Sequence, residues 1–228
     1  MKTPIGTDKT PHFIIVEDKA IKCLVYGLIS KINEKYRFKD EGQDQNDYVF
    51  DSETNNIICG IYTLKDGKKD FEGIPDVSGF ENLESILLIA DNDAEEEIKN
   101  FYLELNKKQK AFDIPTVKHI LLPMRSEDGH EIEDYIYKYS ENDKEKFKKI
   151  ECFTTKYIQQ FKLNYHYEHK IGKRVLSIFM YLENENLRNI DESKCNYIKD
   201  FARQISEKDE VFVDFKDFWE ALSNFLQS

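Results

Sequence analysis

One segment constrains the fold of this chain more than any other: five consecutive apolar residues, Ile86 to Ala90, lead directly into Asp91 and Asp93. A continuous apolar run of this kind is typical of a strand that is buried on both faces of a sheet. The two aspartates then follow the carboxyl end of that strand, which is where open α/β sheets bind ligands. Their carboxylates favour a divalent cation such as Mg²⁺, although an Asp-Asn-Asp turn that caps a helix beginning at Ala94 accounts for them equally well.

A second segment has the same pattern. Residues Phe13 to Val16 are apolar, Glu17 and Asp18 follow them, and residues 19–32 place apolar side chains at helical spacing. If the two apolar runs form neighbouring strands of a parallel sheet, Glu17 converges with the aspartate pair on one edge. Carboxylates held that close together repel one another unless a cation binds or a proton is retained.

A third acidic pair follows a third strand candidate. Residues 117–123 predict this strand, and Glu133 and Asp134 come shortly after it. Helices are predicted between the strands, at residues 19–32 and from residue 94 to about residue 109. This order of elements predicts an α/β fold with a parallel sheet and right-handed crossovers.

The rest of the chain divides into a hairpin, a turn-rich segment and a run of helices. A polar loop is expected at residues 37–47, a hairpin over residues 48–64 and turns over residues 65–79. The helices expected after residue 129 cover residues 131–139, 144–161, 172–181, 196–205 and 215–226. We therefore expect an α/β domain over residues 12–139 and a helical C-terminal extension over residues 140–228 that packs on it.

Composition and charge narrow the functional classes. The 228 residues are 40% hydrophobic, which supplies a substantial core. The net charge of −11 argues against a protein that coats DNA non-specifically, because such proteins need a basic surface. It leaves room for an acidic site filled by a metal ion. No apolar run reaches the length of a membrane span and the start lacks an apolar signal region, so we expect a cytoplasmic protein with no membrane partner.

The cysteines point to the same compartment. Cys23, Cys59, Cys152 and Cys195 are widely separated, and no two of them form a Cys-x-x-Cys pair. This pattern favours reduced thiols over a disulfide framework or a zinc site. Cys23 falls among the apolar residues of the first predicted helix, where we expect it to be an ordinary core residue.

The ordered set of acidic motifs resembles the Toprim fold, a small parallel, Rossmann-like α/β sheet flanked by helices. The sequence Val-Glu17-Asp is similar to the first Toprim motif, and Asp91-Asn-Asp93 is similar to the second. The third element runs from Pro123 through Gly129 to Glu133-Asp134, and it resembles an uncharacterised bacterial and archaeal Toprim-like family related to OLD-type nucleases. The resemblance covers residues 12–139. Asp18 departs from it, because many Toprim proteins have glycine at that position.

The resemblance implies a Mg²⁺- or Mn²⁺-dependent phosphoryl-transfer enzyme that acts on nucleic acid, DNA rather than RNA, and most closely a Toprim-type nuclease. It implies catalytic roles for Glu17, Asp91 and Asp93, with Glu17 as a metal ligand or a general acid–base. The implied metal ligands are Glu17, Asp91, Asp93, Glu133 and Asp134. The alternative is a Toprim-fold binding or regulatory module that has lost catalysis and works with a partner protein such as a separate ATPase, and a homo-oligomer is compatible with both.

One basic residue is a candidate for substrate binding. Lys173 lies in a stretch where basic residues alternate with Tyr165 and Tyr167, and such a pattern can grip a phosphate backbone. A solvated start of a helix accounts for the same residues. A receiver domain also gathers acids at strand ends, but it requires a lysine after a later strand, and the sequence has no convincing equivalent.

Overall fold

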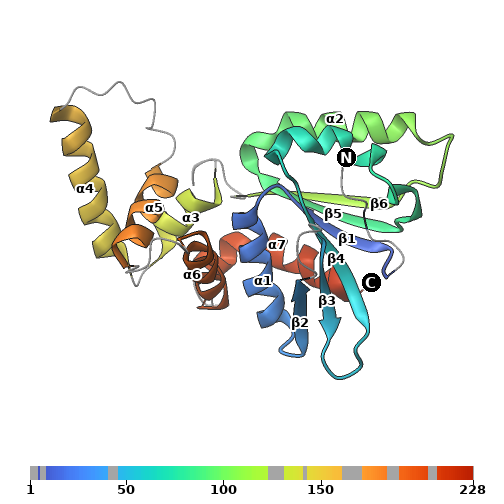
Figure 1. Ribbon diagram of the computed structural model, residues 1–228, viewed down its shortest axis with the longest axis horizontal. Helices are drawn as coiled ribbons and strands as arrows, with labels where there is room; N and C mark the ends of the chain where they lie inside the picture. The colour runs from blue at the N-terminus through green and yellow to red at the C-terminus, as the bar shows by residue number, and fades with distance from the viewer. Residues whose placement is uncertain are drawn as a thin grey trace.

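The two apolar runs of the sequence form neighbouring parallel strands at the centre of a six-stranded sheet (Figure 1). The computed structural model describes residue 5 and residues 9–40, 46–122, 131–140, 143–160, 171–183, 190–204 and 210–227. In spatial order the strands are β2-β3-β4-β1-β5-β6. Their bounds are β1 (His12–Val16), β2 (Tyr36–Asp40), β3 (Asn46–Asp51), β4 (Ile57–Thr63), β5 (Ser85–Asp91) and β6 (Thr116–Leu122).

The α/β class is confirmed, but the prediction of a parallel sheet is only partly right, because the sheet is mixed. Strands β4, β1, β5 and β6 run parallel, whereas β3 pairs antiparallel with both β4 and β2. The tight turn between β3 and β4, with Asn55 at a φ of 58°, permits only an antiparallel neighbour. The loop predicted at residues 37–47 is wrong at both ends: β2, at the edge of the sheet, occupies its start, and β3 begins at Asn46. Strand β2 was not predicted because its exposed Arg37 and Lys39 resemble loop residues, whereas polar side chains are also common on an edge strand.

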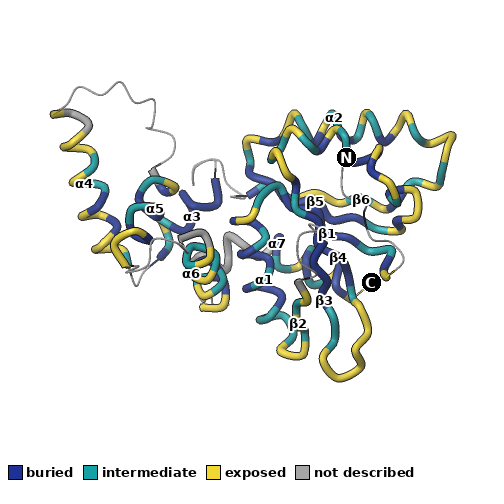
Figure 2. The backbone as a smooth tube through the Cα atoms, in the orientation of Figure 1, coloured by how far each residue is buried: buried dark blue, intermediate teal, exposed yellow. Residues whose placement is uncertain are grey.

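Alternate side chains of the central strands enter two separate cores. Ile14 of β1 and Leu87 of β5 face a core shared with helices α1 (Lys19–Ile32), α6 (Ile190–Gln204) and α7 (Glu210–Gln227). Phe13 and Ile86 face the opposite core. That side is covered by α2 (Glu95–Lys107) and by the 3₁₀ helices η1 (Gly67–Asp76), η2 (Phe80–Asn82) and η3 (Asn92–Ala94). Strands β1 and β5 are accordingly buried along most of their length (Figure 2).

The C-terminal helices divide between two places. Helices α3 (Ile132–Tyr139), α4 (Lys144–Gln160) and α5 (Ile171–Glu183) form a cluster of their own around Phe147, Val175 and Phe179, and Figure 1 shows it beside the sheet. Helices α6 and α7 return to pack on α1. All the predicted helices are present with shifted ends, and the division at residues 139 and 140 stays a prediction. Within the described part of the chain, no helix is long and apolar enough to cross a membrane.

The prediction of four reduced cysteines is wrong for two of them. Cys23 on α1 and Cys195 on α6 form a disulfide, with their Cα atoms 5.3 Å apart and 172 residues between them in sequence. Cys59 and Cys152 are free, the first buried and the second exposed. Sequence spacing could not reveal the pair, because only the packing of α6 on α1 brings the two side chains within bonding distance.

Gly60 in β4 permits the close stacking of one core layer. Gly60 lies opposite Phe13 in the register of β4 and β1, and a Cβ at position 60 would lie 2.2 Å from the nearest carbon of the Phe13 ring. The ring is fully buried and also contacts the ring of Tyr48 edge-on. We predict that Gly60→Ala lowers the free energy of unfolding by about 1 to 3 kcal/mol, since the ring must leave its position. Urea denaturation measures this change. An unchanged midpoint would show that the Phe13 ring moves aside without loss of stability.

Candidate functional site

Glu17 and Asp91 meet at the carboxyl edge of the sheet. Glu17 directly follows β1, and its backbone N–H donates to the carbonyl of Ile89 at 3.0 Å, which extends the pairing of β1 with β5. Its side-chain Oε2 accepts a hydrogen bond from the backbone N–H of Asp91, also at 3.0 Å. The first and second acidic motifs are therefore side by side because β1 and β5 are adjacent parallel strands in register, so that their carboxyl ends lie at the same edge.

Asp91 is buried and links the sheet to the helical cluster. It is 7% exposed, and its Oδ1 accepts a hydrogen bond from the backbone N–H of Ile132 at 3.1 Å, where α3 begins. The alternative reading, an Asp-Asn-Asp turn that caps a helix, is wrong. The residue that precedes α2 is Ala94, and neither η3 nor α2 has a side-chain cap. The carboxylate of Asp91 instead points into the space between strand end and helix start.

Asp93 lies on the outer side of the same turn. Its Oδ2 is 2.9 Å from Nζ of Lys68, and the same ammonium donates to the Asp93 carbonyl at 3.0 Å. Lys68 belongs to η1, in the segment predicted as turns. Gly67, just before it, has a φ of 65°, and a Cβ at this position would lie 3.8 Å from Oε1 of Glu17. The start of η1 therefore closes against Glu17 and brings a lysine to Asp93.

Glu133 and Asp134 point to different partners. Glu133 is 1% exposed, and its Oε1 lies 2.5 Å from Nζ of Lys194 on α6. Oδ1 of Asp134 accepts a hydrogen bond from the backbone N–H of Gly172 at 2.7 Å, in the first turn of α5. A Cβ at Gly172 would lie 2.3 Å from the Asp134 Cα, so α3 and α5 are in close contact here. The structure thus places Glu133 beside the strand-end acids and uses Asp134 to hold α5.

Asp18 also belongs to this group, although it was not among the site residues predicted from the sequence. It is the N-cap of α1, where its Oδ1 accepts from the backbone N–H of Ile21 at 2.9 Å. Burial raises the pKa of Asp18, the charge of Glu133 raises it further, and the Ile21 hydrogen bond and the charges of Lys194 and Lys173 lower it. Its position next to Glu17 was the available signal. We call Glu17, Asp18, Asp91 and Glu133 the acidic cluster.

The pKa values of Glu17 and Asp91 show that burial disfavours the charged forms of these acids. Burial, with smaller contributions from the charges of Asp18 and Asp93, raises the pKa of Glu17 to about 7, against the opposing effects of the Asp91 N–H and Lys68. Burial and the charges of Asp18, Glu17 and Glu133 raise the pKa of Asp91 to about 9. At neutral pH the cluster therefore retains protons or attracts a cation, because its negative charges are buried with too few positive neighbours.

Lys173 lies at the border of the acidic cluster. Its Nζ is 3.4 Å from Oε1 of the buried Glu131, and about half of its side chain is exposed. Burial lowers the pKa of Lys173, but the charges of Glu133, Glu131 and Asp18 outweigh that effect and raise it overall. The aromatic residues that accompany it in sequence, Tyr165 and Tyr167, lie outside the described residues, as do residues 123–130 of the third motif.

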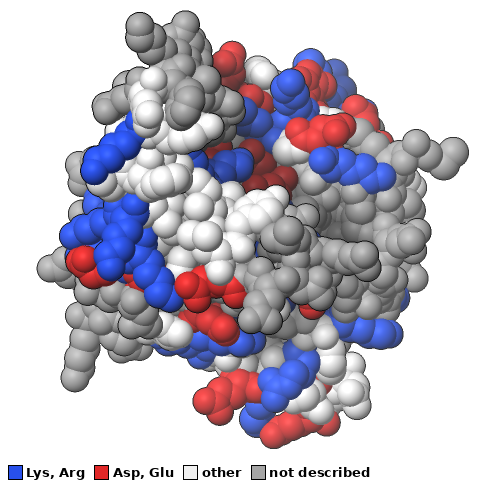
Figure 3. Space-filling model, turned by 60° about the vertical axis from the view of Figure 1, so that its left-hand side comes forward, with Lys and Arg blue, Asp and Glu red and all other residues white. Residues whose placement is uncertain are grey.

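The donor set of the cluster suits a hard divalent cation, since it consists of carboxylate oxygens in a partly dry setting. The spacing is less favourable: among the residues that the structure describes, no three His, Cys, Asp or Glu side chains are placed to hold a metal ion together. Glu133 and Asp93 are each paired with a lysine. Figure 3 shows acidic side chains set back in a hollow with basic side chains beside them. A bound cation would therefore require side chains of the cluster to rotate inward.

Comparisons of the chain with protein-family models, with curated proteins and with solved structures gave no match.

Proposed function

We propose that this protein is a Mg²⁺- or Mn²⁺-dependent phosphoryl-transfer enzyme of Toprim type, most closely a nuclease that acts on DNA. The observation that carries the proposal is the hydrogen bond from the Asp91 N–H to Glu17 across two adjacent strands, between acids whose pKa values are both raised. Buried carboxylates with raised pKa values are typical of functional sites. The Toprim resemblance predicts a glutamate and an Asp-x-Asp motif on neighbouring strand ends, and the adjacent positions of Glu17 and Asp91 support it.

Each residue of the site has a proposed role. Asp91 and Glu17 are the primary metal ligands, and Asp93 completes the set when it turns from Lys68 toward the cation. Bound between these carboxylates, Mg²⁺ or Mn²⁺ would neutralise charge on the reacting phosphate and activate the attacking water. The alternative role for Glu17 is that of a general acid–base beside the metal ion, since its pKa of about 7 in the metal-free protein lets it exchange a proton near neutral pH. Contact with a substrate phosphate is the role proposed for Lys173, which is half-exposed at the border of the cluster.

A cleavage assay with a matched pair of variants tests the proposal. We expect cleavage of labelled DNA in Mn²⁺, and we expect Asp91→Asn to lower its rate by at least about tenfold, because the change removes a charge that only the metal-bound state needs. Glu53→Gln is the control, since Glu53 is an exposed residue of the turn between β3 and β4, at the opposite edge of the sheet. Equal activity of Asp91→Asn, or no cleavage of DNA or RNA with any divalent metal, would contradict it.

A second candidate has an observation in its favour. Lys194 and Lys68 already neutralise Glu133 and Asp93, as expected of a binding or regulatory module that no longer needs a metal and works with a partner such as an ATPase. Isothermal titration calorimetry with Mn²⁺ separates the two candidates. Binding that disappears in Asp91→Asn favours the enzyme, and the absence of binding favours the module.

A further inference from the structure

We propose that the Cys23–Cys195 disulfide is a redox latch on the acidic cluster, which holds Lys194 against Glu133 when closed and frees it when reduced. The proposal rests on the proposed function only for its consequence, the affinity of the cluster for a divalent cation. With Lys194 withdrawn, the buried charge of Glu133 has lost its closest cation, and a divalent cation binds more tightly. Reduction therefore favours the metal-bound state.

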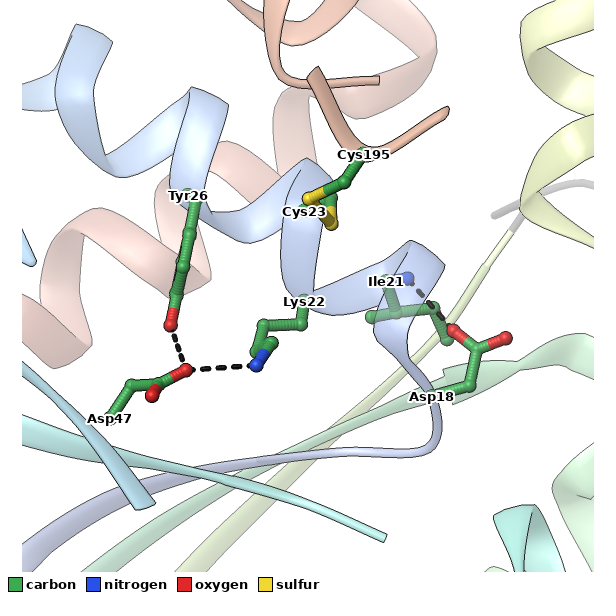
Figure 4. Close-up of a disulfide and its surroundings, with 7 residues drawn as sticks. All are labelled: Asp18, Ile21, Lys22, Cys23, Tyr26, Asp47 and Cys195. Carbon is green, nitrogen blue, oxygen red and sulfur yellow. Dashed lines mark hydrogen bonds and ion pairs between the residues drawn. A yellow bond between two sulfur atoms is a disulfide. The ribbon is translucent and has the colours of Figure 1, made fainter. Parts of the chain in front are cut away.

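The disulfide constrains the backbone next to Lys194. Cys195 directly follows Lys194 on α6, and Cys23 lies on α1, the helix that Asp18 caps (Figure 4). One covalent bond thus fixes the α6 backbone relative to α1 at the residue next to Lys194. From this position Lys194 reaches Glu133 at 2.5 Å, with 20% of its side chain exposed. The same lysine also lowers the pKa of Asp18.

The second half of α6 is anchored without the cysteines. A Cβ at Gly27 would lie 2.5 Å from both the Ala202 Cβ and the Lys199 carbonyl, so α1 and α6 are in close backbone contact there. The hydroxyl of Tyr197 is 2.8 Å from Oγ of Ser140 and donates to a carboxylate oxygen of Asp143 at the same distance. After reduction α6 therefore stays docked from Tyr197 onward, and the freedom gained is confined to its first turns. Lys194 lies in those turns.

The chemistry is an ordinary thiol–disulfide exchange, and a low-molecular-weight or protein thiol is the reductant. A reductant thiolate attacks the sulfur of Cys195, which is partly exposed, forms a mixed disulfide and releases the Cys23 sulfur as a thiolate that takes up a proton. A second reductant thiolate then attacks the reductant sulfur of the mixed disulfide. This step releases Cys195 as a thiolate, which takes up a proton, and forms the oxidised reductant disulfide. One protein disulfide and two reductant thiols become two protein thiols and one reductant disulfide.

The first test reads Lys194 directly and needs no metal. The full chain, oxidised or reduced, is treated briefly with an amine-acylating reagent, and the modified lysines are quantified by peptide mass spectrometry. We expect reduction to raise the acylation rate of Lys194 about fivefold or more, because only the unprotonated amine is acylated and a close ion pair both holds the protonated form and shields the nitrogen. Lys199, further along α6, is the internal control. An unchanged rate at Lys194, or peptide mapping that finds no Cys23–Cys195 link after mild oxidation, would overturn the latch.

The second test measures the consequence at the cluster. Calorimetry with Mn²⁺ is expected to give a Kd about tenfold lower for the reduced chain, since a nearby positive charge has been withdrawn. Lys194→Met is expected to bind with the tighter Kd in both redox states, whereas Lys199→Met should keep the difference. Similar Kd values for the oxidised and reduced native chain count against the latch. If neither state binds Mn²⁺, the proposed metal site fails, and the acylation rates still decide the latch.

Discussion

Asp91→Asn is expected to raise the free energy of unfolding of the metal-free protein at pH 8 by about 3 to 6 kcal/mol. The folded protein holds the Asp91 carboxyl at a pKa of about 9, chiefly through burial. Each pH unit over which the folded form alone holds this proton corresponds to about 1.4 kcal/mol. Asparagine has nearly the same shape, carries no charge, and retains an oxygen to accept from the Ile132 N–H. The substitution therefore removes the free-energy cost of keeping an ionisable carboxyl buried, and it retains the hydrogen bond from the Ile132 N–H.

The pH dependence gives this prediction its sign. Below about pH 4 the folded and unfolded chains both carry a protonated Asp91, so the carboxyl has no effect on stability. As pH rises toward 9, the unfolded chain releases the proton and the folded chain retains it, so stability falls. Glu17 adds to the same decline up to a pKa of about 7. Above pH 9 both states are ionised at Asp91, and its contribution becomes constant.

Denaturant unfolding of native protein and Asp91→Asn, repeated from pH 5 to pH 9 in a chelator, measures the effect. The two curves should coincide most closely at the acidic end and separate as pH rises, whereas Glu53→Gln should follow the native curve throughout. Mn²⁺ should stabilise the native protein increasingly over the same range, because the metal competes with the retained protons. A constant difference between Asp91→Asn and native protein at all pH values would show that burial of this carboxyl does not govern its titration.

Reduction of the Cys23–Cys195 disulfide is expected to lower the free energy of unfolding by about 2 to 5 kcal/mol. The bond closes a loop across a sequence separation of 172 residues, so it restricts the unfolded chain strongly. It also joins α6, near the end of the chain, to α1, the first helix of the chain. This stability effect is independent of the latch, since a purely structural disulfide would show it as well.

Unfolding of the oxidised and reduced chains in guanidinium chloride measures this difference. Cys152→Ser is the matched control, because Cys152 is an exposed free cysteine on α4 and its replacement should leave both curves unchanged. Cys195→Ser should reproduce the reduced curve and remove the dependence on reductant. Identical midpoints with and without reductant would mean that the bond does not form in solution or that the unfolded chain is already restricted.

Features of the site that depend on local pattern were predictable. The apolar run before Asp91 specifies a buried strand, and the shorter run before Glu17 specifies another, because each is read from a few consecutive residues. The helices after residue 129 follow from their periodicity in the same way. Strand β2 was missed because its polar residues match an exposed edge as well as a loop.

The direction in which each carboxylate points was not predictable. Asp134 belongs to the same acidic pair as Glu133, yet it bonds to Gly172, which follows it by 38 positions in sequence. Lys194 and Lys68 reach the acids from segments that carry no recognisable motif. Such contacts depend on how helices dock, and a single sequence contains no periodic signal for docking.

By itself the sequence determined which residues form the central strands and that an acid follows each of two of them. It did so because alternation, apolar runs and helical spacing are properties of neighbouring residues. Only the tertiary structure decided that β1 and β5 lie side by side, that Asp91 is buried under α3, and that Cys195 meets Cys23. Those outcomes depend on packing between segments far apart in the chain, where burial and the field of nearby charges set the pKa of each acid.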